Sequence, residues 1–222
     1  MFTPRISGAQ RHQARIGPAR RLLVAAVFAL GAGGLLTSLG GCTTAEPQRR
    51  EADPAFARKT VVYETRESPG TIVVDPGSHF LYLVQPGGQA IRYGVGVGGE
   101  GYGWSGIATV HSKQEWPDWY PPVEMLERKP ELKKAMVQLQ SGLGMPGGPD
   151  NPIGARALYL WQGNKDTLYR IHGTNEPWTI GENVSAGCIR LTNDDVADLY
   201  NRAPIGTKVV VLATLAPSTA QR

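Results

Sequence analysis

The sequence has few residues of the kinds that cross-link proteins or bind metals. Its 222 residues include two cysteines, Cys42 and Cys188, and four histidines. Two cysteines allow at most one disulfide, and no Cys, His, Asp or Glu cluster has metal-ligand spacing. No internal repeat is present either. We therefore predict one domain with a hydrophobic core and without a metal site, because the roughly 150 residues after residue 60 are enough for one core.

The beginning of the chain lacks acidic residues, and the apolar run behind it lacks the length of a stable membrane span. Residues 1–21 contain five arginines and no acid, and residues 22–39 are apolar but interrupted by glycines. A basic segment before a short apolar segment is typical of a secretory signal, whereas a span needs ~20 apolar residues. We predict that residues 1–41 are an export signal, with a transmembrane anchor as the alternative.

The predicted signal ends at Leu39-Gly40-Gly41-Cys42, which resembles the cleavage motif of bacterial lipoproteins. This resemblance implies that Cys42 is lipidated and that acyl chains hold the protein at a membrane. Thr43, where sorting signals of inner-membrane lipoproteins carry Asp, favours the outer membrane of a Gram-negative source. Residues 42–59 are polar and contain prolines, so we predict a flexible tether there.

The basic charge of the chain belongs to the predicted signal. The chain has 23 basic and 19 acidic residues, and residues 1–41 contribute five arginines and no acid. Removing that segment leaves 18 basic residues against 19 acidic ones, a net charge of −1. We therefore infer no nucleic-acid partner from the charge.

From Thr60 the sequence changes to short β-branched and aromatic runs that are separated by Gly, Pro and Asp. This pattern is typical of strands rather than helices. We predict strands over residues 61–63, 71–75, 79–84, 90–97, 107–111, 156–161, 167–172 and 208–212. The sequence therefore predicts a mainly β domain over residues 60–213, with a β-sandwich or barrel-like fold, and a loose tail over residues 214–222.

A few stretches depart from the strand pattern. Apolar residues at helical spacing predict short helices over residues 123–126 and 130–139. A third helix is expected over residues 194–201, capped by Thr192 or Asn193.

Two stretches are rich in glycine. Residues 141–151 also contain prolines, and a loop of that length in a compact domain is often a lid or a binding loop. Residues 96–103 have the composition of a nucleotide-binding loop, but no helix pattern follows them. We expect a hairpin near the functional site there instead.

His172 and Cys188 are the residues with the clearest chemical potential. A thiolate attacks carbonyl carbon, but a free thiol with a pKa near ~8.5 is mostly protonated at neutral pH, so a nearby imidazole has to take its proton. The 16 positions between the two residues are enough for a strand to end and a second strand to return beside it. The competing interpretation is a buried structural cysteine and a histidine at a strand end.

Two observations favour the reactive pair. Cys188 has no disulfide partner if Cys42 is lipidated, and an odd cysteine in an exported protein suggests a reactive thiol. Gly187 allows an unusual backbone conformation beside it. We expect the amides of Gly187 and Cys188 to face a developing oxyanion.

The surrounding motif is longer than a Cys–His pair. His-Gly-Thr-Asn-x-Pro-x-x-Ile-Gly over residues 172–181 and Ser-x-Gly-Cys-Ile-Arg-Leu over residues 185–191 resemble the active-site signature of the L,D-transpeptidase catalytic domain, the YkuD-like family. The resemblance covers about residues 60–213. One departure is Ala186, where many members carry a histidine.

The resemblance implies transfer of an acyl group from the tetrapeptide stem of peptidoglycan, with release of D-Ala, to the amine of another stem, which gives 3→3 cross-links. It assigns Cys188 as the nucleophile and His172 as the base, and this exchange requires no cofactor. It gives supporting roles in orientation or substrate binding to Gly173, Ser185, Gly187, Arg190, Asn175 and Tyr159. Arg190 is equally interpretable as a member of a structural salt bridge.

The acyl acceptor stays open at this stage. Transfer to an outer-membrane protein and hydrolysis as an L,D-carboxypeptidase use the same acyl-enzyme. A lipoprotein that binds the cell wall without catalysis is the alternative from another class. We expect an exported protein of the periplasm or cell envelope with peptidoglycan stem peptides as its substrates.

Overall fold

The computed structural model describes residues 51–99 and 101–213. The predicted signal, the lipidation site Cys42 and the predicted tail lie outside these residues. Within the described ranges, no helix is both long enough and apolar enough to cross a membrane.

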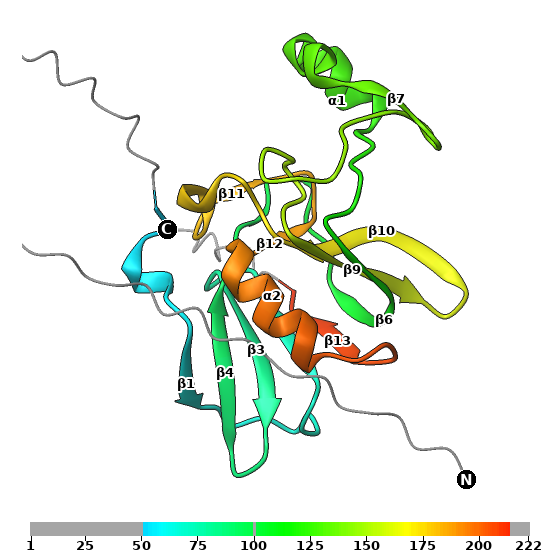
Figure 1. Cartoon of the computed structure of the whole chain (residues 1–222). Coiled ribbons are helices and arrows are strands. Elements are labelled where there is room, and N and C mark those ends of the chain that lie inside the picture. The colour runs from blue at the N-terminus through cyan, green and yellow to red at the C-terminus, as the bar shows by residue number, and fades with distance from the viewer. Residues whose placement is uncertain (1–50, 100, 214–222) are drawn as a thin grey trace, which may run out of the picture. The chain divides into compact units, whose positions relative to one another are not determined.

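Most strands belong to one mixed sheet of nine strands (Figure 1), which confirms the mainly β prediction. Their order in the sheet is β1-β4-β3-β2-β13-β6-β9-β10-β12. They are β1 (Lys59–Val62), β2 (Ile72–Asp75), β3 (Phe80–Gln85), β4 (Gln89–Gly94), β6 (Gly106–Glu115), β9 (Arg156–Gln162), β10 (Lys165–His172), β12 (Ile189–Arg190) and β13 (Lys208–Val211). The pairs β13–β2 and β10–β12 are parallel, and the other neighbours are antiparallel.

Two smaller sheets accompany the large one. Strand β5 (Val97–Gly98) pairs with β11 (Asn183–Ser185), and β7 (Val137–Leu139) pairs with β8 (Gly142–Gly144). Just before β5, Gly96 exchanges two backbone hydrogen bonds with Arg190 of β12, at 2.9 and 2.8 Å. This bridge joins the last strand of the large sheet to the segment that follows β4, so the sheet closes on itself in a barrel-like manner.

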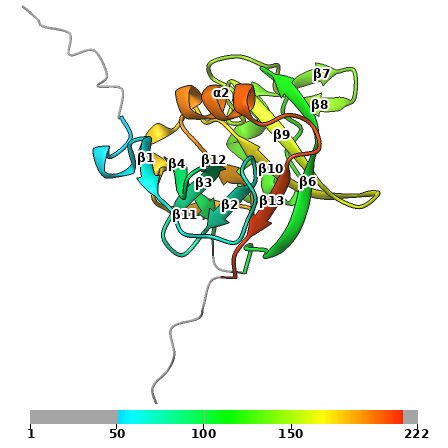
Figure 2. The same cartoon turned by 90° about the horizontal axis from the view of Figure 1, so that it is seen from below.

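The core lies inside this curved sheet and beneath helix α2 (Asn193–Arg202). Alternate residues are buried in β13 and in the first half of β6, as the period of two requires, whereas Ile72, Val73 and Val74 of β2 are buried in succession. The helix begins where the Thr192 hydroxyl accepts a hydrogen bond from the Asp195 amide at 3.2 Å, one of the two caps that the sequence predicts. Figure 2 shows α2 along one side of the sheet and the β7–β8 hairpin projecting at another side.

The segment after α1 (Val123–Arg128) differs from the prediction of a helix over residues 130–139. A 3-10 helix, η2 (Pro130–Ala135), ends early, and residues 137–139 form β7. A helix that short has little stability of its own, and Gly142, at φ 125°, allows the tight return into β8. The predicted long loop over residues 141–151 therefore contains a strand at its beginning.

The N-terminal boundary also differs from the prediction. Residues 51–59 belong to the predicted tether, yet they contain a 3-10 helix, η1 (Pro54–Phe56), and the first residue of β1. The Asp53 side chain caps η1 by accepting from the Ala55 amide at 2.8 Å. Phe56 packs near Phe80, with 5.4 Å between ring centroids. The polar composition of residues 51–59 gave no sign of the contact between Phe56 and Phe80.

Candidate active site

The parallel pairing of β10 and β12 places the two predicted catalytic residues next to each other. Ile171 pairs with Ile189, and His172 pairs with Arg190. Both isoleucines are buried in the core, so His172 and Arg190 face the opposite side of the sheet. Cys188 lies two positions before Arg190 and therefore joins the same side.

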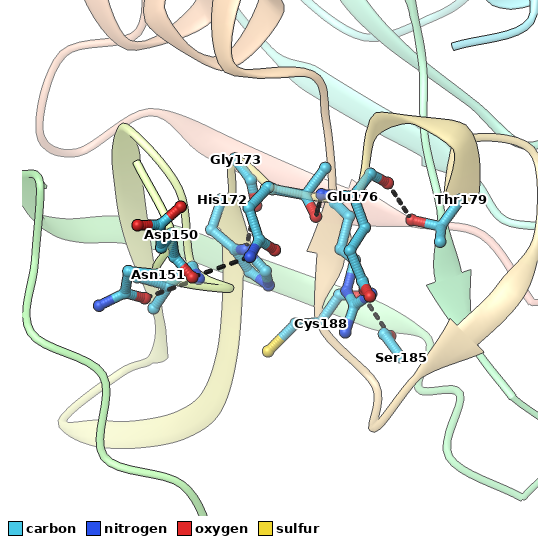
Figure 3. A network of polar contacts seen from close by, with 12 residues as sticks. Asp150, Asn151, His172, Gly173, Glu176, Thr179, Ser185 and Cys188 are labelled. Carbon is cyan, nitrogen blue, oxygen red and sulfur yellow. Dashed lines mark hydrogen bonds and ion pairs between the residues drawn. The ribbon is translucent and has the colours of Figure 1, made fainter. Parts of the chain in front are cut away.

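His172 and Cys188 line one cavity of about 1090 Å³. In Figure 3 the thiol of Cys188 and the imidazole of His172 face the same space. The cavity is bounded on the sheet side by strands β9 to β12 and on the other side by the segment around α1. The latter contributes Trp119, Tyr120, Pro122, Met125, Arg128, Lys129, Leu132 and Met145.

The imidazole of His172 is held in one tautomer. Its Nδ1 lies 2.6 Å from the carbonyl oxygen of Gly173. A carbonyl can only accept, so Nδ1 carries the proton and Nε2 has a free lone pair. Burial, followed by the charge of Arg190, lowers the pKa of His172 to about 4. The ring is therefore neutral at physiological pH and able to accept a proton at Nε2.

The surroundings of Cys188 have opposing effects on the pKa of its thiol. Burial raises the pKa of the thiol. The backbone N–H of Arg170 and the positive charges of Arg170 and Arg190 oppose this rise in the pKa. The resting thiol is accordingly protonated at neutral pH, and donors are already in place for the thiolate.

Ser185 and Gly187 shape the turn that presents Cys188. The Ser185 hydroxyl donates to the Cys188 carbonyl at 2.5 Å and accepts from the Gly187 amide at 3.1 Å. This arrangement corrects the expectation that the Gly187 amide faces an oxyanion, because that amide is already bonded within the turn. The Cys188 amide makes no hydrogen bond to another described residue.

Three further predicted residues lie around the same cavity. A guanidinium nitrogen of Arg190 lies 3.5 Å from a Glu176 carboxylate oxygen, a long ion pair. Asn175 donates to the Asp150 carbonyl at 2.8 Å. Tyr159 lies under the guanidinium of Arg170, 4.5 Å from its ring centroid. All eight predicted active-site residues are thus near one another, as lining residues or as direct neighbours of the catalytic pair.

Sequence reasoning missed Arg170 and its partner Asp166. Their side chains form two hydrogen bonds of 2.7 and 2.8 Å, and Arg170 lines the cavity. Arg170 lies two residues before His172 on the same strand, so the period of two that puts His172 on the cavity face also puts Arg170 there. That alternation was visible in the sequence.

A barrel-like β fold with a partly buried thiol, a neutral imidazole and a large cleft has the parts that a thiol-dependent acyl-transfer enzyme requires. Residues 69–211 match the YkuD family, which is described as the L,D-transpeptidase catalytic domain. The match covers well over half of the chain, and the chain belongs to this family. Ala186, where many members carry a histidine, lines the cavity beside Cys188.

Proteins with similar sequences are also named as L,D-transpeptidases. The chain is 36% identical over 146 residues to Probable L,D-transpeptidase ErfK/SrfK of Escherichia coli, which is 64% of this chain and 43% of that protein. It is 35% identical over 141 residues to Probable L,D-transpeptidase YbiS of the same species, which is 62% and 43% of the two chains. The chain thus spans less than half the length of these curated relatives.

A solved structure from Brucella melitensis is 52% identical to this chain, with a TM-score of 0.48. The similarity covers 72% of this chain and 96% of that one. That protein is called "Probable carnitine operon oxidoreductase caia". In the present chain the glycine-rich residues 96–103 lead into strand β6. A dinucleotide-binding loop of the Rossmann type would lead into a helix.

Proposed function

We propose that this protein is a peptidoglycan L,D-transpeptidase that transfers an acyl group through Cys188. The observation that carries the proposal is the pairing of β10 with β12, which brings Cys188 and a His172 with a free Nε2 to one cavity. Family membership supports the choice of a tetrapeptide stem as the donor.

In the first half of the reaction, His172 Nε2 takes the thiol proton as the sulfur attacks the carbonyl carbon of the third stem residue. Neither group is charged at rest, so proton transfer accompanies the attack. The tetrahedral intermediate collapses when its C–N bond breaks, and the imidazolium returns the proton to the departing D-Ala nitrogen. The Cys188 amide, which makes no hydrogen bond to another described residue, is available to donate to the oxyanion.

In the second half, an acceptor amine attacks the thioester, His172 takes a proton from that amine, and the C–S bond breaks. The proton then returns to the sulfur. Gly173 keeps the imidazole oriented in both halves. Arg190 is suited to hold a stem carboxylate, since its ion pair with Glu176 is long, at 3.5 Å, and a carboxylate can bind a guanidinium through two hydrogen bonds. Asn175 and Tyr159 form the walls, and Ser185 and Gly187 maintain the turn.

The direct test is the intact mass of the protein after incubation with a disaccharide-tetrapeptide. We expect an adduct equal to the substrate minus D-Ala, located on the Cys188 peptide. Cys188→Ala is the control and should form none. A folded protein that forms no adduct and releases no D-Ala would contradict the proposal and favour a lipoprotein that binds the wall without catalysis.

The acceptor is identified by the same assay. Addition of a second tetrapeptide stem should convert the adduct into a 3→3 cross-linked dimer. Two other outcomes define variants of the same chemistry: transfer to a lysine of an outer-membrane protein, or loss of the adduct to water as in an L,D-carboxypeptidase. We propose stem-to-stem transfer because it is the reaction implied by the family.

We further propose that Cys42 is lipidated and that the enzyme works in the periplasm, anchored to the outer membrane if its source is Gram-negative. The support is the sequence Leu39-Gly40-Gly41-Cys42 behind a basic and then apolar segment. Cell fractionation tests it: the wild type should be found with membranes and Cys42→Ala should not be acylated. Membrane retention of Cys42→Ala without its signal would contradict lipid anchoring.

A further inference from the structure

Residues 53–58 precede the sheet and hold a single aromatic side chain against it. The segment is bent by η1, in which the Phe56 amide donates to the Asp53 carbonyl at 2.9 Å. Figure 1 shows this turn, in blue-cyan, just before β1 and beside the β1–β4 edge. The segment has the polar composition of a tether, but its side chains contact the folded domain. We call residues 53–58 the N-terminal arm.

The Phe56 side chain occupies a slot formed by two glycines. A Cβ atom on Gly181 would lie 2.2 Å from Phe56 Cε2, and one on Gly94 would lie 2.4 Å from Phe56 Cβ. Neither contact is compatible with a side chain, so the ring fits only because both positions are glycine. Gly181 also has φ 92°, and its amide donates to the Val95 carbonyl at 3.0 Å.

The slot belongs to the segment that connects the catalytic residues. Gly181 lies between His172 and Cys188, just after η3 (Pro177–Thr179). The next residue, Glu182, accepts from the Val97 amide at 3.0 Å. Phe56 therefore packs against the connection at the point where it turns back toward Cys188.

The arm has a second anchor on the other side of Cys188. Arg58 lies 3.2 Å from Asp198 and 3.6 Å from Asp195, both on α2. Asp198 also accepts a hydrogen bond from the hydroxyl of Tyr93 at 2.7 Å. Helix α2 begins directly after the strand that follows Cys188. The arm thus contacts the element before the nucleophile and the element after it.

We propose that Phe56 is a positioning residue for the acyl-transfer reaction, which holds the connection from His172 to Cys188 in its reactive arrangement. This inference depends on the proposed function for its substrate assay. A protein shortened to Thr60, the boundary that composition suggests, would retain the sheet but lose this support. Small displacements of a nucleophile have large effects on rate, so loss of the ring should slow acylation roughly tenfold.

The test compares Phe56→Ala with Tyr63→Ala in the full chain. Tyr63 is a matched control because it belongs to the same end of the domain and stacks on Tyr82, with 4.3 Å between centroids, and it does not line the catalytic cavity. We expect a roughly tenfold slower acylation for Phe56→Ala, near wild-type acylation for Tyr63→Ala, and partial recovery for Phe56→Leu. Binding of the tetrapeptide should change little, so the loss falls on kcat rather than KM.

A second readout does not need the wall substrate. The rate of iodoacetamide alkylation of Cys188, followed against pH on the Cys188 peptide, should have a shifted profile in Phe56→Ala and an unchanged one in Tyr63→Ala. Equal profiles and equal acylation rates for Phe56→Ala and the wild type would overturn the inference. So would an equal loss in Tyr63→Ala. If the wild type forms no acyl-enzyme, the proposed function fails, whereas the alkylation profiles still decide whether Phe56 positions Cys188.

Discussion

At the scale of single residues, the site depends on keeping His172 neutral in a buried place. Its Nδ1–H donates a hydrogen bond to the Gly173 carbonyl oxygen, with 2.6 Å between Nδ1 and that oxygen. Burial, together with the charge of the nearby Arg190, lowers the pKa of His172 to about 4. A histidine that was charged at rest could not accept the thiol proton. The same burial that keeps His172 neutral for its proposed role as the base therefore makes the folded state sensitive to acid.

We predict that His172 causes an acid-dependent loss of stability. The folded pKa is about 4 and the unfolded value is 6.5, so the stabilising contribution is complete above about pH 6.5. It is lost as pH falls toward 4, because the unfolded chain binds the proton first. The free energy of unfolding should fall by roughly 2–3 kcal/mol over this window. Urea unfolding of the wild type and of His172→Gln at several pH values measures this decrease. If the free energy of unfolding of the wild type fell no more than that of the variant, the prediction would be refuted.

We also predict that Arg170 assists ionisation of the nucleophile. Its positive charge opposes the rise in the Cys188 pKa that burial causes. Arg170→Met removes the charge but keeps the backbone N–H, so the pKa of Cys188 should rise further. The pH dependence of thiol alkylation measures this change. Lys165→Met, an exposed residue on the same strand, is the control, and a shift of the same size in that variant would exclude a local effect.

At the scale of elements, the turn between β11 and β12 is tightly constrained by its neighbours. Gly187 has φ 111°, and a Cβ there would lie 2.3 Å from Tyr169 and 2.7 Å from the Tyr102 carbonyl oxygen. Tyr169 cannot move away freely, because it stacks on Trp104 with 5.1 Å between centroids. The turn therefore has no room for a side chain at position 187, beside the proposed nucleophile Cys188.

Gly187→Ala should lower both stability and acylation. Left-handed backbone alone costs about 1–2 kcal/mol for an L-residue, and the contact with Tyr169 adds to it. We expect a lower Tm and an acylation rate reduced by more than tenfold. Gly103→Ala is the control, since a Cβ at Gly103 meets nothing within 4 Å. A fully active Gly187→Ala would show that the turn adapts.

Elements also show where sequence patterns succeed and fail. The structure contains the strands that carry His172 and its neighbours almost as predicted, although β10 has a register shift between Asp166 and Arg170. Leu132, Met136 and Leu139 have the spacing of a helix, yet residues 137–139 pair with Gly142–Gly144. Short segments of this kind are decided by their partner, which local composition does not contain.

At the scale of the whole molecule, the predicted signal and the rest of the chain differ in net charge. The full chain has a sequence pI of about 9.1, whereas loss of residues 1–41 leaves 18 basic and 19 acidic residues. The processed protein should therefore focus below pH 7, and an unprocessed Cys42→Ala protein well above it. Isoelectric focusing measures the pI of the two proteins, and their intact masses show whether residues 1–41 have been removed. A membrane-bound wild type that still focuses near 9 would contradict processing at Cys42.

The sequence by itself was enough to predict the chemistry that we propose for this protein. A histidine and a cysteine within an extended motif, and strands with a regular alternation, indicate a thiol acyltransferase in a mainly β domain. These features are local, and local features can be recognised in a linear chain. The tautomer of His172 also follows from its neighbour, because Gly173 provides the carbonyl.

Tertiary structure decided the features that depend on distant partners. The closing bridge between Gly96 and Arg190, the ion pair of Arg58 with α2, and the slot for Phe56 each join residues far apart in the chain. Composition assigned Phe56 to a tether because residues 42–59 are polar and contain prolines, and its glycine partners at positions 94 and 181 have no pattern that would reveal the contact. Only the folded chain brings those two glycines together and makes the empty space that the ring fills.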